Sequence, residues 1–208
     1  DVAEICTGGA VGTVWEWCDA VGAGDARRAL GLLAELLAAG ETAYRLVPLL
    51  ATHFARLGVV ACMQPRHAAP DITGAWRRAV GEGRLSRPFP WRSLRDAGAT
   101  LAFSSDWDVA EMDPLVGLYS AVTRADLPGD DAWAVEERVD LGTAIHAYTA
   151  GGAFANLAER DRGVLREGML ADLVVLDGDP FGFEDPRELL ATTVRTTIVG
   201  GAVVHGSG

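Results

Sequence analysis

An apolar run that ends in an aspartate limits the folds open to this chain more than any other feature of its sequence. Residues 98–103 read Gly-Ala-Thr-Leu-Ala-Phe, and Ser104, Ser105, Asp106 and Trp107 follow directly. Such a run is typical of a buried strand. A carboxylate just after the carboxyl end of a buried strand is where parallel α/β barrels hold their chemical groups. The pattern therefore predicts an α/β fold with a functional edge at Asp106.

A second apolar run lies earlier in the chain, and helices are predicted between the two runs. Residues 59–63 read Val-Val-Ala-Cys-Met and have the composition of a buried strand. Residues 64–71 contain two prolines and are predicted to form a loop. Helices are expected over 76–80 and 91–96. Strand and helix thus alternate, which indicates parallel strands.

The remaining segments before residue 160 are predicted to be mainly helical. Residues 1–57 are expected to form helices, with a further helix that begins near Pro48. A helix over 26–39 carries a stripe of Leu30, Leu33 and Leu37, which Leu32 and Leu36 widen. Clear start signals stand later in the chain: Asp113 before Pro114, followed by apolar residues at helical spacing, and Asp140 before a helix over 141–148. A short helix is expected over 153–157.

The hydrophobic period changes after about residue 160. Residues 170–176 are predicted to form a strand, and residues 194–199 and 202–205 flank the pair Gly200-Gly201. That pair suits a two-residue hairpin turn, which needs positive φ. We therefore expect barrel units over residues 1–160 and an added β module over residues 161–208.

Composition excludes several classes of function. The formal net charge of −11 offers no basic stripe for nucleic acid and no attraction to an anionic membrane surface. No stretch reaches the roughly 18 apolar residues of a membrane span. Three widely spaced cysteines without a CxxC pair indicate a reducing, cytoplasmic environment. The sequence starts without Met, so it leaves open whether a signal segment precedes it.

Asp106 is the first candidate for chemistry. A carboxylate at a strand end can bind a divalent metal and take a proton from metal-bound water. The alternative is a turn aspartate that bonds to its own backbone. Trp107 beside it either forms the wall of a substrate pocket or packs in the core. His67, at the end of the other predicted strand, either contacts substrate or is solvated.

The other histidines do not suggest a complete metal site. His53 and His146 fall inside predicted helices and His205 in the terminal hairpin, so structural roles are expected for all three. The chain has no HxH, HExxH, GxSxG or phosphate-loop pattern. Zinc hydrolases generally need about three protein ligands per metal. We therefore expect that this chain cannot complete such a site alone.

From about Phe54 onward the chain resembles the amidohydrolase superfamily, in the branch called amidohydrolase family 3. The similar stretches occur in order along the chain: residues 54–67, which include Gln64 and His67, residues 89–94, 105–107, 113–115, 147–149, 163–177 and 197–204. The ordered set is specific to the family and covers about three quarters of the chain.

The resemblance implies a fold and a chemistry. It implies that the chain is the C-terminal part of a (β/α)8 TIM-type barrel with a small β-sandwich segment, and that it catalyses metal-dependent hydrolysis of a C–N bond in a small molecule, with zinc as the expected ion. Asp106 matches the aspartate of the last barrel strand, a metal ligand and proton shuttle. Gln64 and His67 match positions near the substrate, where Trp107 is also expected. Gly163, Gly168, Ala171 and Asp172 match structural positions of the sandwich.

Two features depart from the family pattern. The strand-one HxH is absent, and residues 1–50 look either diverged or frame-disrupted, with no histidine at 4–11 and Thr42 where a ligand histidine is expected. One hypothesis is a fragment of a hydrolase, inactive alone, that needs an N-terminal barrel half or another copy of itself. The other is a non-catalytic half-barrel remnant that has lost its metal site.

Overall fold

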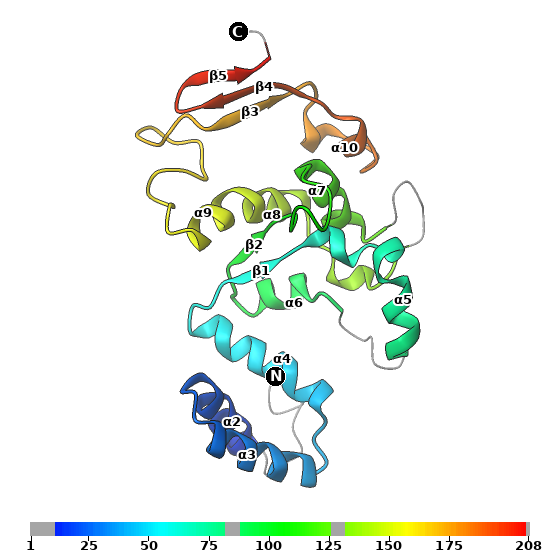
Figure 1. The fold of residues 1–208 in the computed structure, drawn as a ribbon, viewed down its shortest axis with the longest axis vertical. Helices are drawn as coiled ribbons and strands as arrows, with labels where there is room; N and C mark the ends of the chain where they lie inside the picture. Colours follow the sequence, from blue (N-terminus) through cyan, green and yellow to red (C-terminus); the bar gives the residue numbers. More distant parts are fainter. Residues whose placement is uncertain (1–10, 82–87, 126–131, 207–208) are drawn as a thin grey trace. The chain divides into compact units, whose positions relative to one another are not determined.

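The computed structural model describes residues 11–81, 88–125 and 132–206. The chain forms two compact units, one of residues 1–59 with 97–99 and one of residues 60–96 with 100–208 (Figure 1). In the described ranges, no helix combines the length and the apolar character needed to cross a membrane.

The first unit is built from three helices, α2 (Val11–Gly22), α3 (Ala26–Ala38) and α4 (Ala43–Arg56). The carboxylate of Asp25 caps α3 by accepting a hydrogen bond from the Arg28 amide at 3.0 Å. Helix α2 packs against both α3 and α4. The core between them consists of small and large apolar side chains: Val14, Trp17, Cys18, Ala20, Ala29, Leu36, Leu46 and Leu49.

Two predictions for this unit were wrong in detail. Leu30 and Leu37 of the expected stripe are 67% and 48% exposed, whereas Leu36, which was expected only to widen that stripe, is 1% exposed. Leucines cover most of α3, so the sequence alone does not show which face meets a neighbour; the face of Ala29 and Leu36 is the buried one. Pro48 does not start its helix but lies inside α4.

The second unit contains a parallel pair of strands, β1 (Ala61–Met63) and β2 (Leu101–Phe103), aligned from Ala61 opposite Leu101 to Met63 opposite Phe103. Strand β2 is buried along its length, as predicted. Strand β1 is shorter than expected, because the amide of Val59 instead donates to the Phe54 carbonyl at the end of α4.

The prediction of a loop over residues 64–71 was also wrong. Pro65 opens a 3₁₀ helix, η1 (Pro65–Ala68), and Pro70 opens α5 (Pro70–Val80). A proline is well tolerated at the first helical position, where its missing N–H would have no partner. The two prolines therefore begin helices here. Helix α6 (Trp91–Asp96) has the predicted bounds.

Two helix starts were predicted correctly. Asp113 caps α7 (Pro114–Thr123) by accepting from the Leu115 amide at 2.9 Å. Asp140 caps α8 (Leu141–His146) by accepting from the Thr143 amide at 2.8 Å. The chain continues through a π-helical turn, Ala147–Gly151, into α9 (Gly152–Ala155), and a 3₁₀ turn, Val135–Glu137, precedes α8.

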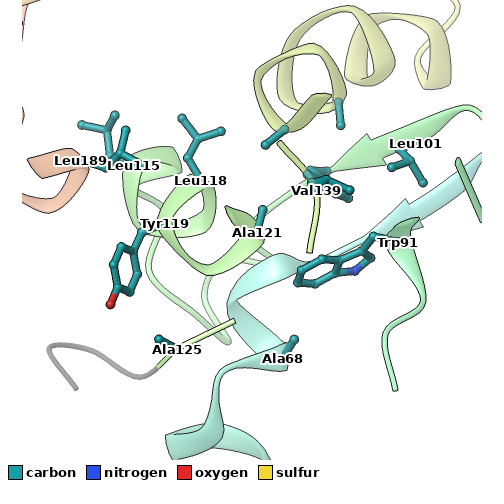
Figure 2. Close-up of a cluster of buried hydrophobic side chains, with 13 residues drawn as sticks. Ala68, Trp91, Leu101, Leu115, Leu118, Tyr119, Ala121, Ala125, Val139 and Leu189 are labelled. Atoms are coloured by element: carbon teal, nitrogen blue, oxygen red, sulfur yellow. The ribbon is translucent and has the colours of Figure 1, made fainter. Parts of the chain in front are cut away.

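The core of the second unit surrounds Trp91 (Figure 2). Trp91 is fully buried and meets the ring of Phe103 edge-on at 5.7 Å between centroids; Phe103 meets Tyr148 in the same way at 5.6 Å. Leu115 and Leu118 of α7 and Leu189 belong to the same cluster. This packing fixes β2, and with it the segment that follows β2.

The C-terminal region is an antiparallel sheet in the order β3 (Leu173–Leu176), β4 (Val194–Val199), β5 (Ala202–His205). The turn between β4 and β5 is Gly200-Gly201 with φ of 56° and 84°, as the sequence predicted. The 3₁₀ turn Pro180–Gly182 and helix α10 (Glu188–Ala191) lie between β3 and β4. A carboxylate oxygen of Asp172 accepts from the Gly200 amide at 2.7 Å, in keeping with a structural role.

The strands that the structure describes thus form a parallel pair and a three-stranded antiparallel sheet. The architecture is mixed α/β, as predicted. A closed (β/α)8 barrel and a two-layered sandwich stay predictions.

Candidate functional site

The carboxyl ends of β1 and β2 meet at one edge of the parallel sheet. The Ser104 amide donates to the Met63 carbonyl at 3.1 Å, so the two chains leave the sheet side by side. Gln64 and His67 follow β1, and Asp106 and Trp107 follow β2. The four predicted site residues therefore belong to two segments that start at the same edge, which is the active edge of parallel α/β folds.

The structure brings Asp106 and His67 together. His67 lies in η1, and its Nε2 atom is 3.8 Å from Oδ2 of Asp106. The His67 side chain is 23% exposed, and its Nε2 atom is buried without a hydrogen-bond partner. The Asp106 side chain is 52% exposed. A nitrogen with no partner beside an accessible carboxylate leaves both groups available to a ligand.

Asp106 itself has a left-handed backbone, with φ of 58°. Asp and Asn occupy this region more readily than most residues, because their short polar side chains bond locally. The Asp106 carbonyl accepts from the Val109 amide at 2.7 Å, which closes a turn around it.

Gln64 and Trp107 take different positions at the same edge. The Gln64 amide nitrogen lies 3.3 Å from Ser104 Oγ and links the two segments. Trp107 is 65% exposed, so it does not pack in the core. Its amide donates to Ser105 Oγ at 3.2 Å. Because the Trp107 indole is exposed next to Asp106, contact with a substrate stays the prediction for this residue.

Arg66 is a residue of this site that the sequence analysis did not single out. It is 7% exposed, and its guanidinium donates to both carboxylate oxygens of Asp71, at 2.8 and 2.6 Å. On another side its Nε donates to Oε2 of Glu111 at 3.0 Å. Arg66 thus joins α5 to the segment after β2. No local pattern indicated this contact, because Glu111 is distant in sequence.

The pKa values of both carboxylates that contact Arg66 are lowered. Hydrogen bonds from the guanidinium lower the pKa of Asp71. The pKa of Glu111 is lowered by a hydrogen bond from its own backbone amide and then by Arg66. The pKa of Arg66 is raised, mainly by its bond to Asp71. All three groups are therefore charged at neutral pH.

The described residues do not make up a complete metal site. Asp106 and His67 offer two donor atoms, and no group of three or more His, Cys, Asp or Glu side chains that could hold a metal exists in the part of the chain that the structure describes. A zinc site needs about three protein ligands. A metal ion at this edge would therefore need further ligands besides these two.

The two described cysteines differ in their surroundings. Cys18 is buried, and burial raises the pKa of its thiol to about 11, so it stays protonated at neutral pH. Cys62 is a free cysteine exposed on β1. Cys6 lies outside the described residues.

Comparison with known proteins identifies the family. The model of the amidohydrolase family, in the family 3 branch, matches residues 25–205. The chain belongs to the amidohydrolase family. The match confirms the resemblance found in the sequence and begins upstream of Phe54, where that resemblance starts.

Three similar proteins illustrate the range of the family. Protein LONG AFTER FAR-RED 3 of Arabidopsis thaliana is 32% identical over 165 residues, 79% of this chain. N-substituted formamide deformylase of Arthrobacter pascens is 33% identical over 111 residues, 53% of this chain. The crystal structure of an uncharacterized metal-dependent hydrolase from Pyrococcus horikoshii OT3 matches 64% of this chain with a TM-score of 0.55 and 28% identity.

This chain is much shorter than these relatives. It spans 28% of the Arabidopsis protein, 20% of the Arthrobacter protein and 27% of the Pyrococcus chain. The similarity establishes ancestry and the mixed α/β fold at the site edge.

Proposed function

We propose that this chain is part of a metal-dependent hydrolase that cleaves an amide-type C–N bond in a small-molecule substrate. The observation that carries the proposal is the approach of His67 and Asp106 to 3.8 Å at the carboxyl edge of two parallel strands. The family match, the metal-dependent Pyrococcus hydrolase and the deformylase from Arthrobacter, whose name describes cleavage of a formamide, support it.

Asp106 is the proposed catalytic residue. Its exposed carboxylate can take a proton from the water that attacks the carbonyl carbon. The same carboxyl group can then give the proton to the departing nitrogen, so that the C–N bond breaks to a carboxylic acid and an amine. A group that first accepts and then donates needs solvent or substrate contact, which the 52% exposure of its side chain provides.

His67, Gln64 and Trp107 are proposed to hold the substrate. The buried Nε2 of His67 has no hydrogen-bond partner, so a substrate oxygen or nitrogen could satisfy it. Gln64 lies at the start of the same segment, and its amide oxygen can accept from a donor while its nitrogen bonds to Ser104. The exposed indole of Trp107 offers an apolar face for the rest of the substrate.

A divalent ion, with zinc expected, is part of the proposal although the described residues supply only two donors for it. Asp106 would be one ligand. We propose that the other ligands come from a further barrel half, in the same protein or in another copy of this chain. A complete (β/α)8 barrel with its added β-sandwich would supply the strand ends that such ligands occupy.

The test is metal analysis and an amide-hydrolysis panel on the full-length protein and on this chain. Bound metal with turnover of N-substituted amides, and loss of turnover in Asp106→Asn, is the expected result. Asp108→Ala is the matched control, because it removes an exposed carboxylate from the same segment. A full-length protein with no metal and no turnover would support the non-catalytic alternative.

A further inference from the structure

We propose that Arg66 is a positioning residue, which through Glu111 holds the loop that carries Asp106 against the helical turn that carries His67. This inference rests on the proposed function, since it concerns the residues that carry it. Arg66 adjoins His67 within η1, and Glu111 stands near the far end of the loop, residues 104–112, that contains Asp106.

The loop is tied to the segment after β1 at its start and near its far end. At its start the Ser104 amide bonds to Met63, and Ser104 Oγ bonds to Gln64. Within the loop, the Val109 amide donates to the Asp106 carbonyl. This hydrogen bond shapes the turn but does not attach the loop to another segment. In the described residues, the ion pair of Glu111 with Arg66 is what ties the second half of the loop to the segment after β1. Asp106 lies between the two ties.

The guanidinium suits this role by shape as well as charge. Its planar fork donates in two directions at once, toward Asp71 at 2.6 and 2.8 Å and toward Glu111 at 3.0 Å. A lysine carries the charge but cannot span both carboxylates with fixed geometry. Because Arg66 is almost fully buried, losing one partner leaves a charge that must find another arrangement. Such a shift moves η1, and with it the ring of His67.

Asp71 provides a matched control for Glu111. Both carboxylates contact the same guanidinium, and both carry one charge at neutral pH. Asp71, however, belongs to α5, which continues the segment of Arg66 and His67, whereas Glu111 belongs to the loop after β2. A merely structural role for Arg66 predicts similar effects of Asp71→Asn and Glu111→Gln. A positioning role predicts that Glu111→Gln alone releases the Asp106 loop.

Amide hydrogen exchange on the 208-residue chain tests this without any reference to activity. Glu111→Gln is expected to speed exchange of the Val109 amide, which bonds to the Asp106 carbonyl, by about tenfold or more. Asp71→Asn is expected to leave it within about twofold of the wild-type rate. Equal protection of Val109 in wild type and Glu111→Gln would overturn the proposal.

Kinetics on the full-length protein give the second readout. Glu111→Gln should lower kcat by about 10- to 100-fold with KM within about threefold, because a displacement of the order of 1 Å at a catalytic group has effects of that size. Arg66→Lys should resemble Glu111→Gln, and Asp71→Asn should retain most of kcat. Equal kcat losses in Glu111→Gln and Asp71→Asn would overturn the positioning role. Absence of turnover in the wild type would instead contradict the proposed function, while the exchange experiment would still decide the role of Arg66.

Discussion

The guanidinium carbon of Arg124 lies 4.4 Å from the ring centre of Trp91, and neither side chain is exposed to solvent. Arg124 donates to three backbone carbonyls, those of Pro88, Phe89 and Trp133, at 2.9 to 3.3 Å. Burial lowers the pKa of Arg124 to about 10, against the raising effect of nearby glutamates. A buried cation thus ties the segment before α6 to the segment that follows α7.

Replacing Arg124 should strongly destabilise the second unit. Arg124→Met keeps much of the volume but removes the hydrogen bonds that the guanidinium donates to three backbone carbonyls, and a hydrogen bond to a charged group contributes about 1.5–3 kcal/mol. We expect a loss of at least about 3 kcal/mol, measured by urea unfolding of the chain. Arg138→Met, at an exposed position, should stay within about 0.5 kcal/mol. A midpoint for Arg124→Met equal to that of the wild type would show that the carbonyls find other donors.

A second prediction concerns the close approach of a helix to β2. A Cβ atom on Gly151 would lie 2.0 Å from the Leu101 carbonyl oxygen, and backbone cannot move aside as a flexible side chain can. Gly151→Ala should therefore cost about 3 kcal/mol. The neighbouring Gly152 has a helical φ of −62°, and a Cβ atom there would lie 3.9 Å from the Ala147 carbonyl oxygen, an ordinary contact, so Gly152→Ala should be neutral or stabilise by up to about 1 kcal/mol. Thermal unfolding compares the stabilities of the two variants. Equal losses of stability would contradict the explanation by close approach of the backbone.

Local signals in the sequence were sufficient for several elements. Asp113 and Asp140 cap helices as predicted, because a capping side chain bonds to an amide two or three residues away. The Gly200-Gly201 turn was predicted for the same kind of reason, since positive φ is a property of the residues themselves. The strand-end position of Asp106 also follows from a local run of apolar residues.

Contacts between distant segments could not be predicted in this way. The buried face of α3 depends on which helix packs against it, and nothing in the pattern of leucines chooses Leu36 over Leu30. The ion pair of Arg66 with Glu111 depends on how the two strand ends are aligned. The distance between His67 and Asp106 depends on the same alignment. The sequence therefore indicated candidate groups for a site, and the structure shows how those groups are arranged.

Asp106 allows catalysis and backbone conformation to be separated. Asp106→Asn and Asp106→Ala both remove the carboxylate, so both should abolish turnover of the full-length protein. The φ of 58° favours Asn over Ala, so only Asp106→Ala should also lose about 1 kcal/mol of stability. Amide turnover and urea unfolding of the two variants test these expectations separately. Near-normal turnover in Asp106→Asn would remove Asp106 from the mechanism.

The Arg66 cluster should make the chain sensitive to acid. The folded-state pKa values of Asp71 and Glu111 lie below their ordinary values, so both groups bind protons more weakly when folded. Their contribution to stability is present above the unfolded carboxyl range near pH 4 and is lost as pH falls through the folded values. Urea unfolding at pH 7 and at about pH 3 should show that the free energy of unfolding falls less between these pH values in Arg66→Met than in the wild type. An identical loss in both proteins would mean that other carboxylates cause the acid sensitivity.

The last prediction concerns association of the 208-residue chain. In the described residues β1 and β2 pair only with each other, which leaves one open edge on each strand. The antiparallel sheet exposes Val174, Val203 and Val204 by 56%, 46% and 62%. Open edges and exposed valines favour pairing with another chain.

We therefore expect the chain to self-associate at concentrations of about 10–100 μM, a range typical of weak contacts of this kind, as measured by sedimentation velocity. Val204→Lys places a charge on the edge strand β5 and should weaken association by about tenfold, because a buried charge in a strand-to-strand contact is unfavourable. Val135→Lys makes the same substitution at a 41% exposed valine outside the sheets and should leave association unchanged. A sharp monomer across this range, with strongly protected amides in β1 and β5, would show that these edges are stable without a partner chain and would contradict the half-barrel interpretation.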